Sequence, residues 1–173
     1  IVNKIDKPVI IEEIKIQPIK DGENYELEDI LYDTESYELS SESKFTIRCF
    51  KDYLMRNPTY TIRIEGHTDM TPVSKSEIPY IGNLILSQQR STAVMEHFIR
   101  SKYYKSLQEH KRWWLLFNFT ANGLSYGRTL DDNREYTYNT KNDVNKEFSR
   151  RVEFRIITTS DKLIDKVLKE LEK

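Results

Sequence analysis

The sequence has few of the residues that build disulfide-rich or metal-rich folds, with one cysteine and three histidines among 173 residues. The single cysteine, Cys49, excludes an internal disulfide and a cysteine-rich metal site. It falls in an amphipathic helical pattern, where a buried thiol is expected. No apolar run approaches the ~20 residues that a membrane-spanning helix needs. The chain starts at Ile1 rather than Met, so we expect a fragment from which an upstream signal peptide or membrane anchor could be missing.

The sequence also lacks an excess of either charge. It contains 27 Lys and Arg against 28 Asp and Glu, and its formal net charge is −1. This balance predicts no attraction to nucleic acid or to an anionic membrane surface. Eleven tyrosines and seven phenylalanines exclude a disordered composition. The length favours one domain with short appendages, large enough to bury a hydrophobic core.

The periodicity of apolar residues predicts the element order β-α-β-α-β-β-α. We therefore expect an α/β (α+β) fold, a βαβαββ two-layer sandwich whose helices pack on one face of a mixed sheet. The expected domain covers residues 25–160, after a lead-in or linker at 1–24 and before an amphipathic C-terminal helix at 161–173. The expected strands are 25–32, 60–65, 113–121 and 150–159, and the expected helices are 42–53, which Ser40 or Ser41 could cap, and 83–104.

Charged residues at two strand ends and in one helix suggest a ligand site. Asp69 follows the strand at 60–65, and Arg90 lies in the helix that Asn83 is expected to cap. The free N–H groups of that helix start and the Arg90 guanidinium could share one carboxylate. Asp33 ends the first strand and lies at the same sheet edge as Asp69 if the two strands are parallel. Two acids facing one arginine would bind a zwitterion, but an Arg90–Asp69 structural salt bridge and simple turn acids remain alternatives.

The remaining candidates favour binding over catalysis. His67 has no second histidine or cysteine at ligand spacing, so a structural hydrogen bond is expected rather than a metal site. A hydrolase built on His67, Asp69 and Asp33 would lack a nucleophile–base pair. We therefore predict no metal, no cofactor and no enzymatic activity. Adjacent Arg150 and Arg151 should face opposite sides of their strand, one toward the site and one toward solvent.

Taken together, these segments resemble the OmpA C-terminal-like family of peptidoglycan-associated domains. The resemblance covers roughly residues 25–160, in the order found in the family. The segments that carry it are Ile30-Leu31-Tyr32-Asp33, Ser36-Tyr37-Glu38-Leu39, Asn57-Pro58, Ile64-Glu65-Gly66-His67-Thr68-Asp69, Asn83-Leu84 with Leu86-Ser87 and Arg90, and Arg150-Arg151-Val152-Glu153-Phe154.

The resemblance implies non-covalent binding of peptidoglycan through the zwitterionic diaminopimelate of its stem peptide. Asp69 would take the ammonium group with support from Asp33, and Arg90 would take the carboxylate. The resemblance also places the backbone N–H groups near Leu86 beside the carboxylate, gives Thr68 and Asn83 the task of shaping the pocket, and adds Arg150. On this assignment Asp69→Ala and Arg90→Ala should each leave the fold intact and abolish wall binding.

The resemblance further implies a periplasmic domain, tethered to the outer or inner membrane by a segment outside this chain. A homodimer is a candidate assembly. The loop at 70–82 is longer than in simple family members and contains Thr71-Pro72-Val73, which is similar to the MotB and ZorB branch of ion-driven stators. Ser149 replaces the asparagine usual before Arg150, and the segment at 125–148 is longer than usual, so the rim of the pocket departs from the family pattern.

Overall fold

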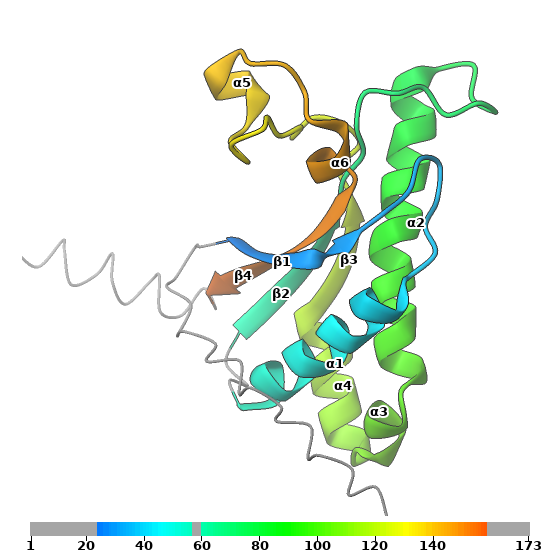
Figure 1. The fold of residues 1–173 in the computed structure, drawn as a ribbon. Coiled ribbons are helices and arrows are strands. Elements are labelled where there is room, and N and C mark those ends of the chain that lie inside the picture. The colour runs from blue at the N-terminus through cyan, green and yellow to red at the C-terminus, as the bar shows by residue number, and fades with distance from the viewer. Residues whose placement is uncertain (1–23, 57–59, 159–173) are drawn as a thin grey trace, which may run out of the picture.

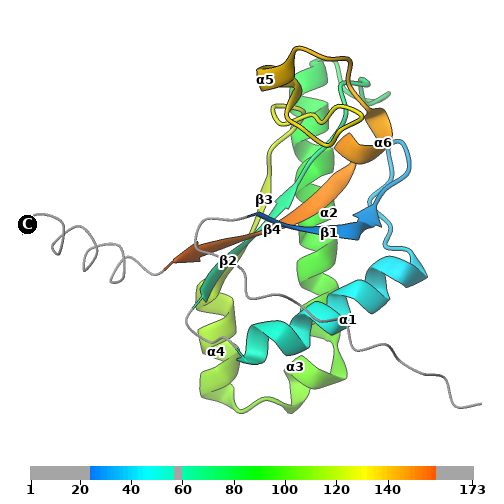
Figure 2. The same cartoon turned by 60° about the vertical axis from the view of Figure 1, so that its left-hand side comes forward.

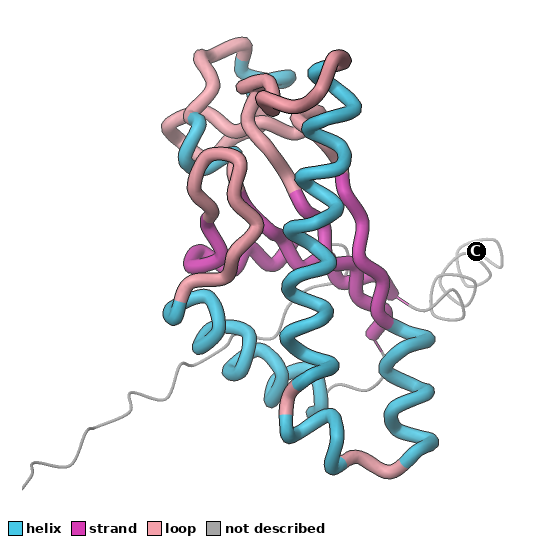
Figure 3. Tube along the Cα trace, turned by 90° about the vertical axis from the view of Figure 1, so that its right-hand side faces the viewer, coloured by secondary structure: helices cyan, strands magenta, loops and turns pink. Residues whose placement is uncertain are grey.

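Strands β2 and β4 form the centre of a four-stranded sheet with the order β1-β4-β2-β3. The computed structural model describes residues 24–56 and 60–158. Helices α1 and α2 cover one face of the sheet, as Figures 1 and 3 show. The strands are β1 Asn24–Leu31, β2 Tyr60–Gly66, β3 Phe119–Gly123 and β4 Arg151–Thr158, and the helices are α1 Ser41–Arg56, α2 Pro79–Arg100, α3 Lys102–Ser106, α4 Glu109–Asn118, α5 Thr137–Thr140 and α6 Lys146–Ser149.

The core lies between the sheet and the two long helices. Alternation along β2 and β4 turns every second side chain toward the helices, where apolar residues exclude water. Phe50 of α1 contacts Phe154 of β4 edge to face, with ring centroids 4.4 Å apart. The buried core residues on these four elements are Ile47, Phe50, Ile62, Ile64, Val94, Phe98, Val152 and Phe154. The expected two-layer α/β fold with a mixed sheet is confirmed.

The strand directions bring the ends of β1 and β2 to one edge of the sheet. Both strands pair antiparallel with β4, so they run parallel to each other. β3 pairs parallel with β2 and makes the sheet mixed. Asp33 and Asp69, which follow β1 and β2, therefore leave the sheet at the same edge, as the sequence predicted.

Two helix boundaries differ from those expected. α2 begins at Pro79 rather than Asn83, because proline fits the first helical positions, where no N–H partner is needed. Residues 113–118 belong to α4 and not to the expected strand, which starts only at Phe119. At the start of α1, the Ser40 hydroxyl accepts the N–H of Ser43, which confirms Ser40 as the cap. The lead-in 1–24, except Asn24, the 161–173 tail and the Cys49 side chain lie outside the described part.

Gly66 and Gly123 allow the ends of β2 and β3 to lie directly against α2. A Cβ on Gly66 would sit 2.0 Å from the Ser87 carbonyl oxygen, and one on Gly123 would sit 2.5 Å from the Gln88 nitrogen. Both atoms belong to the helix backbone, so neither clash can be relieved by turning a side chain. The close contact of strand ends and helix therefore requires glycine at these two positions.

We expect Gly66→Ala to destabilise the domain by roughly 2–4 kcal/mol, because the added methyl group must push α2 away from the sheet. Urea unfolding monitored by circular dichroism measures the change. Gly127→Ala is the matched control, since the nearest atom to its Cβ would lie at an ordinary 3.6 Å. Equal stability of the Gly66→Ala and wild-type proteins would contradict the described contact with α2.

Candidate ligand-binding site

Arg90 joins three segments that meet at the edge of the sheet. It is fully buried in α2. Its Nε donates to the Ser36 carbonyl at 2.9 Å, its Nη1 to the His67 carbonyl at 2.8 Å, and its Nη2 to the Asp33 carbonyl at 3.0 Å. These bonds tie the turns after β1 and β2 to the helix. Burial lowers the pKa of Arg90 to about 10, so the guanidinium remains charged at neutral pH.

Tyr32 supports Arg90 from below. The Arg90 Cζ lies 5.0 Å from the centre of the Tyr32 ring, a cation–π distance. The Tyr32 hydroxyl donates to the Arg90 carbonyl at 3.3 Å. Burial raises the pKa of Tyr32 well above its usual range, so this hydroxyl keeps its proton. The arginine is thus held at both its side chain and its backbone.

Asp69 pairs with Arg150 rather than with Arg90. Its Oδ2 accepts from the Arg150 Nη1 at 3.0 Å, and its Oδ1 accepts from the Thr71 N–H at 3.0 Å. The Arg150 Nε donates to the Tyr32 carbonyl at 3.0 Å. Arg150 therefore connects the carboxylate after β2 to the end of β1, and the alternative of an Arg90–Asp69 salt bridge is wrong.

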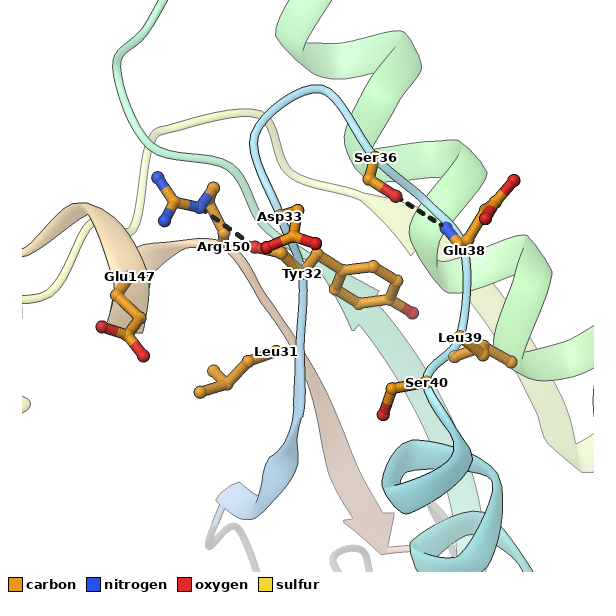
Figure 4. Close-up of a pocket in the computed structure, with 9 residues that line it drawn as sticks. All are labelled: Leu31, Tyr32, Asp33, Ser36, Glu38, Leu39, Ser40, Glu147 and Arg150. Carbon is orange, nitrogen blue, oxygen red and sulfur yellow. Dashed lines mark hydrogen bonds between the residues drawn. The ribbon is translucent and has the colours of Figure 1, made fainter.

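A pocket of about 600 Å³ opens beside Arg150 (Figure 4). Asp33 and Arg150 both line it, and the Asp33 side chain is exposed. Two further acids, Glu38 and Glu147, stand in the wall, so three carboxylates surround one guanidinium. The complete lining is Leu31, Tyr32, Asp33, Ser36, Glu38, Leu39, Ser40, Glu147 and Arg150.

Thr68, Asn83 and Leu86 do not line the pocket, and all three are buried. The Asn83 Nδ2 donates to the carbonyls of Thr71, at 3.0 Å, and Pro79, at 3.1 Å. The Thr68 Oγ1 and Asn83 Oδ1 are buried without a hydrogen-bond partner. Unsatisfied buried oxygens at this place would suit a ligand or a water molecule.

The start of α2 does not lie beside Arg90. Arg90 is eleven residues after Pro79, or about 16 Å along the helix axis. Asn83 is therefore inside the helix instead of capping it, and the N–H of Leu86 belongs to the helical ladder rather than to a free first turn. The expected anion site shared by Arg90 and a helix N-terminus is wrong, because the helix begins one turn earlier.

Sequence reasoning assigned two of the nine lining residues, Asp33 and Arg150, to the site. Among the others, Tyr32, Ser36 and Glu38 entered only as residues that carry the family resemblance, and Glu147 did not enter at all. Tyr32 directly precedes Asp33, but an aromatic residue at a strand end predicts core packing as readily as support of an arginine. Glu147 lies in the short helix α6, and Arg150, three residues later, directly follows that helix. The spacing of three would have suggested a shared face if the helix had been expected.

Comparison with known proteins shows which family the chain belongs to. The sequence model of the OmpA family matches residues 31–142, well over half of the chain and most of the residues around the pocket. The chain belongs to the OmpA family. A relative, the Zorya protein ZorB of Escherichia coli, is 31% identical over 150 residues, which cover 82% of this chain and 59% of that protein. The chain thus spans little more than half the length of this curated relative.

Solved structures share the fold of this OmpA-family domain. The periplasmic domain of Helicobacter pylori MotB superposes with a TM-score of 0.58 at 16% identity, covering 90% of this chain and 88% of that chain. A putative MotB-like protein from Desulfovibrio vulgaris gives 0.52 at 23% identity, covering 76% and 72%. Within the described residues, no helix has both the length and the apolar character to cross a membrane.

A buried group of charged residues lies next to the candidate ligand site of the OmpA-family domain. Glu153 bonds the neighbouring Arg151, whose Nη1 also donates to the Arg128 carbonyl at 3.1 Å. Glu65 accepts from the Arg128 Nη1 at 2.7 Å. The Nε2 of buried His67 lies 3.6 Å from the Glu153 Oε2, a contact too long for a hydrogen bond. Arg151 is therefore buried and paired with Glu153, and Arg150 is paired with Asp69. The prediction that one of these two adjacent arginines faces solvent is wrong.

The same group is the strongest metal candidate among the described residues. Glu65, His67 and Glu153 offer three ligand atoms within 4.8 Å of one another. However, the carboxylates are already occupied by Arg128 and Arg151, and the Arg155 Nε lies 3.5 Å from Glu65. A cation would enter a buried site that already holds three arginines and two glutamates, which is electrostatically unfavourable. We therefore interpret this group as a structural ion-pair network.

The His67 environment predicts that the domain loses stability as the pH falls from 6.5 to 4.5. Burial lowers the pKa of folded His67 to about 4, and Glu153 only partly offsets this effect. The unfolded chain, with an ordinary histidine pKa of ~6.5, binds the proton first, so acidification favours unfolding by about 2 kcal/mol over this window. Burial raises the pKa of Glu153, but the attraction of His67 and Arg151 outweighs that effect and holds this pKa at about 2. Glu153 therefore affects the pH dependence of stability mainly below pH 4.5.

Urea unfolding at a series of pH values tests this prediction, with His67→Gln expected to remove most of the slope. His97 on α2 is the control histidine. Burial and the charges of Lys44 and Arg48 also lower its pKa, so it shows whether any histidine with a lowered pKa accounts for the slope. The slope should largely survive His97→Gln. If the slope disappears with His97→Gln and persists with His67→Gln, the assignment to the buried histidine is wrong.

Proposed function

We propose that this OmpA-family domain binds peptidoglycan non-covalently, through the diaminopimelate of the stem peptide, and so anchors a membrane-associated protein to the bacterial cell wall. One observation carries the proposal. Asp33 and Arg150 line one pocket, Asp69 is bonded to Arg150, and Arg90 donates to the backbone carbonyl of Asp33, so four parts of the sequence are connected at this place. The free end of diaminopimelate carries an ammonium and a carboxylate group, which matches acids and guanidinium groups placed together.

The carboxylates of Asp33 and Asp69 suit the ammonium group. Asp33 is exposed in the pocket, whereas Asp69 is bonded to Arg150, so the ammonium group would share Asp69 with that arginine. The acids Glu38 and Glu147 add negative charge to the pocket wall. Charge-assisted bonds of this kind contribute about 1.5–3 kcal/mol each, which is enough to give specificity.

Two arginines compete for the ligand carboxylate. We propose that Arg150, which lines the pocket, meets the carboxylate, and that Arg90 approaches it from behind Asp33. The three carbonyl bonds of Arg90 account for three of the five N–H groups of a guanidinium, so direct contact by Arg90 stays a prediction. Thr68 and Asn83, with their unpartnered buried oxygens, and Leu86 do not line the pocket, so in this proposal they would shape it only indirectly, by supporting the loop that carries Asp69.

Isothermal titration with two soluble stem tripeptides tests the proposal, one ending in diaminopimelate and one ending in lysine. Both tripeptides carry the side-chain ammonium, but only diaminopimelate adds the carboxylate beside it. We expect the lysine peptide to bind at least roughly ten-fold more weakly, because it leaves a guanidinium unpaired. Equal affinities would show that the pocket does not read the zwitterion.

A second candidate is the wall-anchoring domain of an ion-driven stator in the inner membrane. The sequence similarity to ZorB over 82% of this chain supports it, as does the fold shared with a periplasmic MotB domain. In this proposal the domain is periplasmic, could pair with a second copy, and serves binding rather than catalysis. Fractionation of the full-length gene product distinguishes the two roles, since a stator belongs in the inner membrane and an outer-membrane tether does not.

A further inference from the structure

A second, smaller pocket adjoins the candidate ligand site. Its volume is about 250 Å³, too small for a complete ligand but sufficient for one small group. The loop after β2 forms one wall, with Met70, Thr71 and Pro72. The chain at the start of α6 forms the other wall, with Val144 and Lys146. Two segments that are far apart in the sequence therefore enclose this second pocket.

Hydrogen bonds hold both walls of the second pocket in place. The Thr71 N–H donates to the Asp69 Oδ1 at 3.0 Å, and the Thr71 carbonyl accepts from the Asn83 Nδ2 at 3.0 Å. On the other wall, the Asn145 Oδ1 accepts the Phe148 N–H at 2.9 Å and so caps α6. Because these bonds exist without a ligand, the second pocket is already formed, and a ligand does not have to order its walls.

Asp69 and α6 stand between the two pockets. The Asp69 carboxylate accepts from the Arg150 Nη1 with one oxygen and from the Thr71 N–H with the other, each at 3.0 Å. These two donors therefore lie within about 8 Å of each other. In α6, Lys146 lines the second pocket, and the next residue, Glu147, lines the first. Extended peptide covers about 3.5 Å per residue, so neighbouring residues of one ligand can occupy both pockets.

The two pockets differ in charge. Three acids line the first pocket, so a second carboxylate of the ligand would be repelled there. Among the described residues that line the second pocket, only Lys146 carries a charge. Most of the remaining lining is apolar and comes from Met70, Pro72 and Val144. An ammonium group beside apolar side chains suits a small apolar residue that carries a free carboxylate.

We propose that the second pocket binds the residue that follows diaminopimelate in the stem peptide. Lys146 pairs with the terminal carboxylate of this residue, and Met70 and Val144 contact its side chain. In a stem tetrapeptide the residue is alanine, whose methyl group and free carboxylate match this lining. The inference rests on the proposed function, because diaminopimelate must occupy the first pocket. The domain would then distinguish stem peptides by the residue at which they end.

Isothermal titration with a stem tetrapeptide and with its C-terminal amide tests this proposal. Both peptides carry diaminopimelate and the terminal methyl group, but only the acid offers a carboxylate to Lys146. We expect the amide to bind roughly two- to five-fold more weakly, as for a partly exposed ion pair. Equal affinities overturn the assignment of the second pocket and leave the diaminopimelate site in place. If neither peptide binds, the proposed function fails and the second pocket fails with it.

Three lysine variants locate the contact. Lys146→Gln removes the cation and should bind the acid and the amide equally, whereas Lys146→Arg should keep the preference for the acid. Lys105→Gln is the matched control, because Lys105 is exposed in α3, at the opposite end of the domain from α6 (Figure 2). It should bind both peptides like wild type. A preference that survives Lys146→Gln, or that is lost in Lys105→Gln, overturns the proposal.

A stem tetrapeptide that ends in glycine tests the apolar part of the second pocket. It keeps the carboxylate for Lys146 but lacks the methyl group that would contact Met70 and Val144. We expect it to bind roughly two- to four-fold more weakly than the alanine peptide, the effect of one buried methyl group. Equal affinities for the two peptides overturn the proposed contact with the apolar walls.

Discussion

Asp69→Asn should weaken binding to diaminopimelate-type wall sacculi roughly 10- to 100-fold and leave the fold intact. Asparagine keeps an oxygen that can accept the Thr71 N–H, so the turn after β2 survives. It loses the negative charge that pairs with Arg150 at 3.0 Å and that we propose for the ligand ammonium. Co-sedimentation with purified sacculi measures the loss, and circular dichroism reports on the fold.

Asp143→Asn is the matched control for Asp69→Asn. Asp143 is exposed and carries the same charge. If general electrostatic attraction held the domain on the wall, both variants would lose binding equally. The account requires Asp143→Asn to bind like wild type, and undiminished binding of Asp69→Asn would contradict the assigned pocket.

Arg90→Ala should destabilise the folded domain by roughly 3–5 kcal/mol, in addition to reducing wall binding. The substitution removes three hydrogen bonds to the carbonyls of Asp33, Ser36 and His67, and it leaves a buried space over the Tyr32 ring. The sequence alone predicted an effect on the ligand only. The structure changes that expectation, because Arg90 organises the turns on which both acids stand.

Arg100→Ala provides the comparison on the same helix. Its guanidinium is exposed and pairs with Glu96 one turn away, so the substitution should cost less than about 0.5 kcal/mol. The urea concentrations at the unfolding midpoints of the two variants test this difference in stability. If Arg90→Ala unfolds at the wild-type midpoint, the three carbonyl bonds do not stabilise the domain, and Arg90 would act on the ligand alone.

The sheet was predictable because its signal is local. The alternation in β2 and β4 follows from a two-residue period, and the common direction of β1 and β2 placed Asp33 and Asp69 at one edge. Residues 113–118 were mistaken for a strand because a short aromatic run fits either structure. Only the structure reveals the helical period, because Leu115 and Asn118, three residues apart, are buried, whereas Trp113 and Phe117, four residues apart, are exposed.

The partners of Arg90 could not be predicted, for a physical reason. They are backbone carbonyls, which every residue has, so no residue type marks them in the sequence. The pairing of Asp69 with Arg150 crosses 81 positions of the chain and depends on how β4 enters the sheet. Charged residues indicated that an acid–arginine site exists, but only the fold shows which arginine faces which acid.

The central claim is that Asp33, Asp69 and the neighbouring arginines bind a zwitterion. NMR titration of the labelled domain with the diaminopimelate tripeptide tests it most directly, through the side-chain Nε–H signals of Arg90 and Arg150 and the backbone amides around them. The account predicts saturable shifts at Arg150 and at the amides of Asp33 and Thr71, with the α4 amides unchanged. Shifts confined to another surface, or no shifts at saturating peptide, would contradict it.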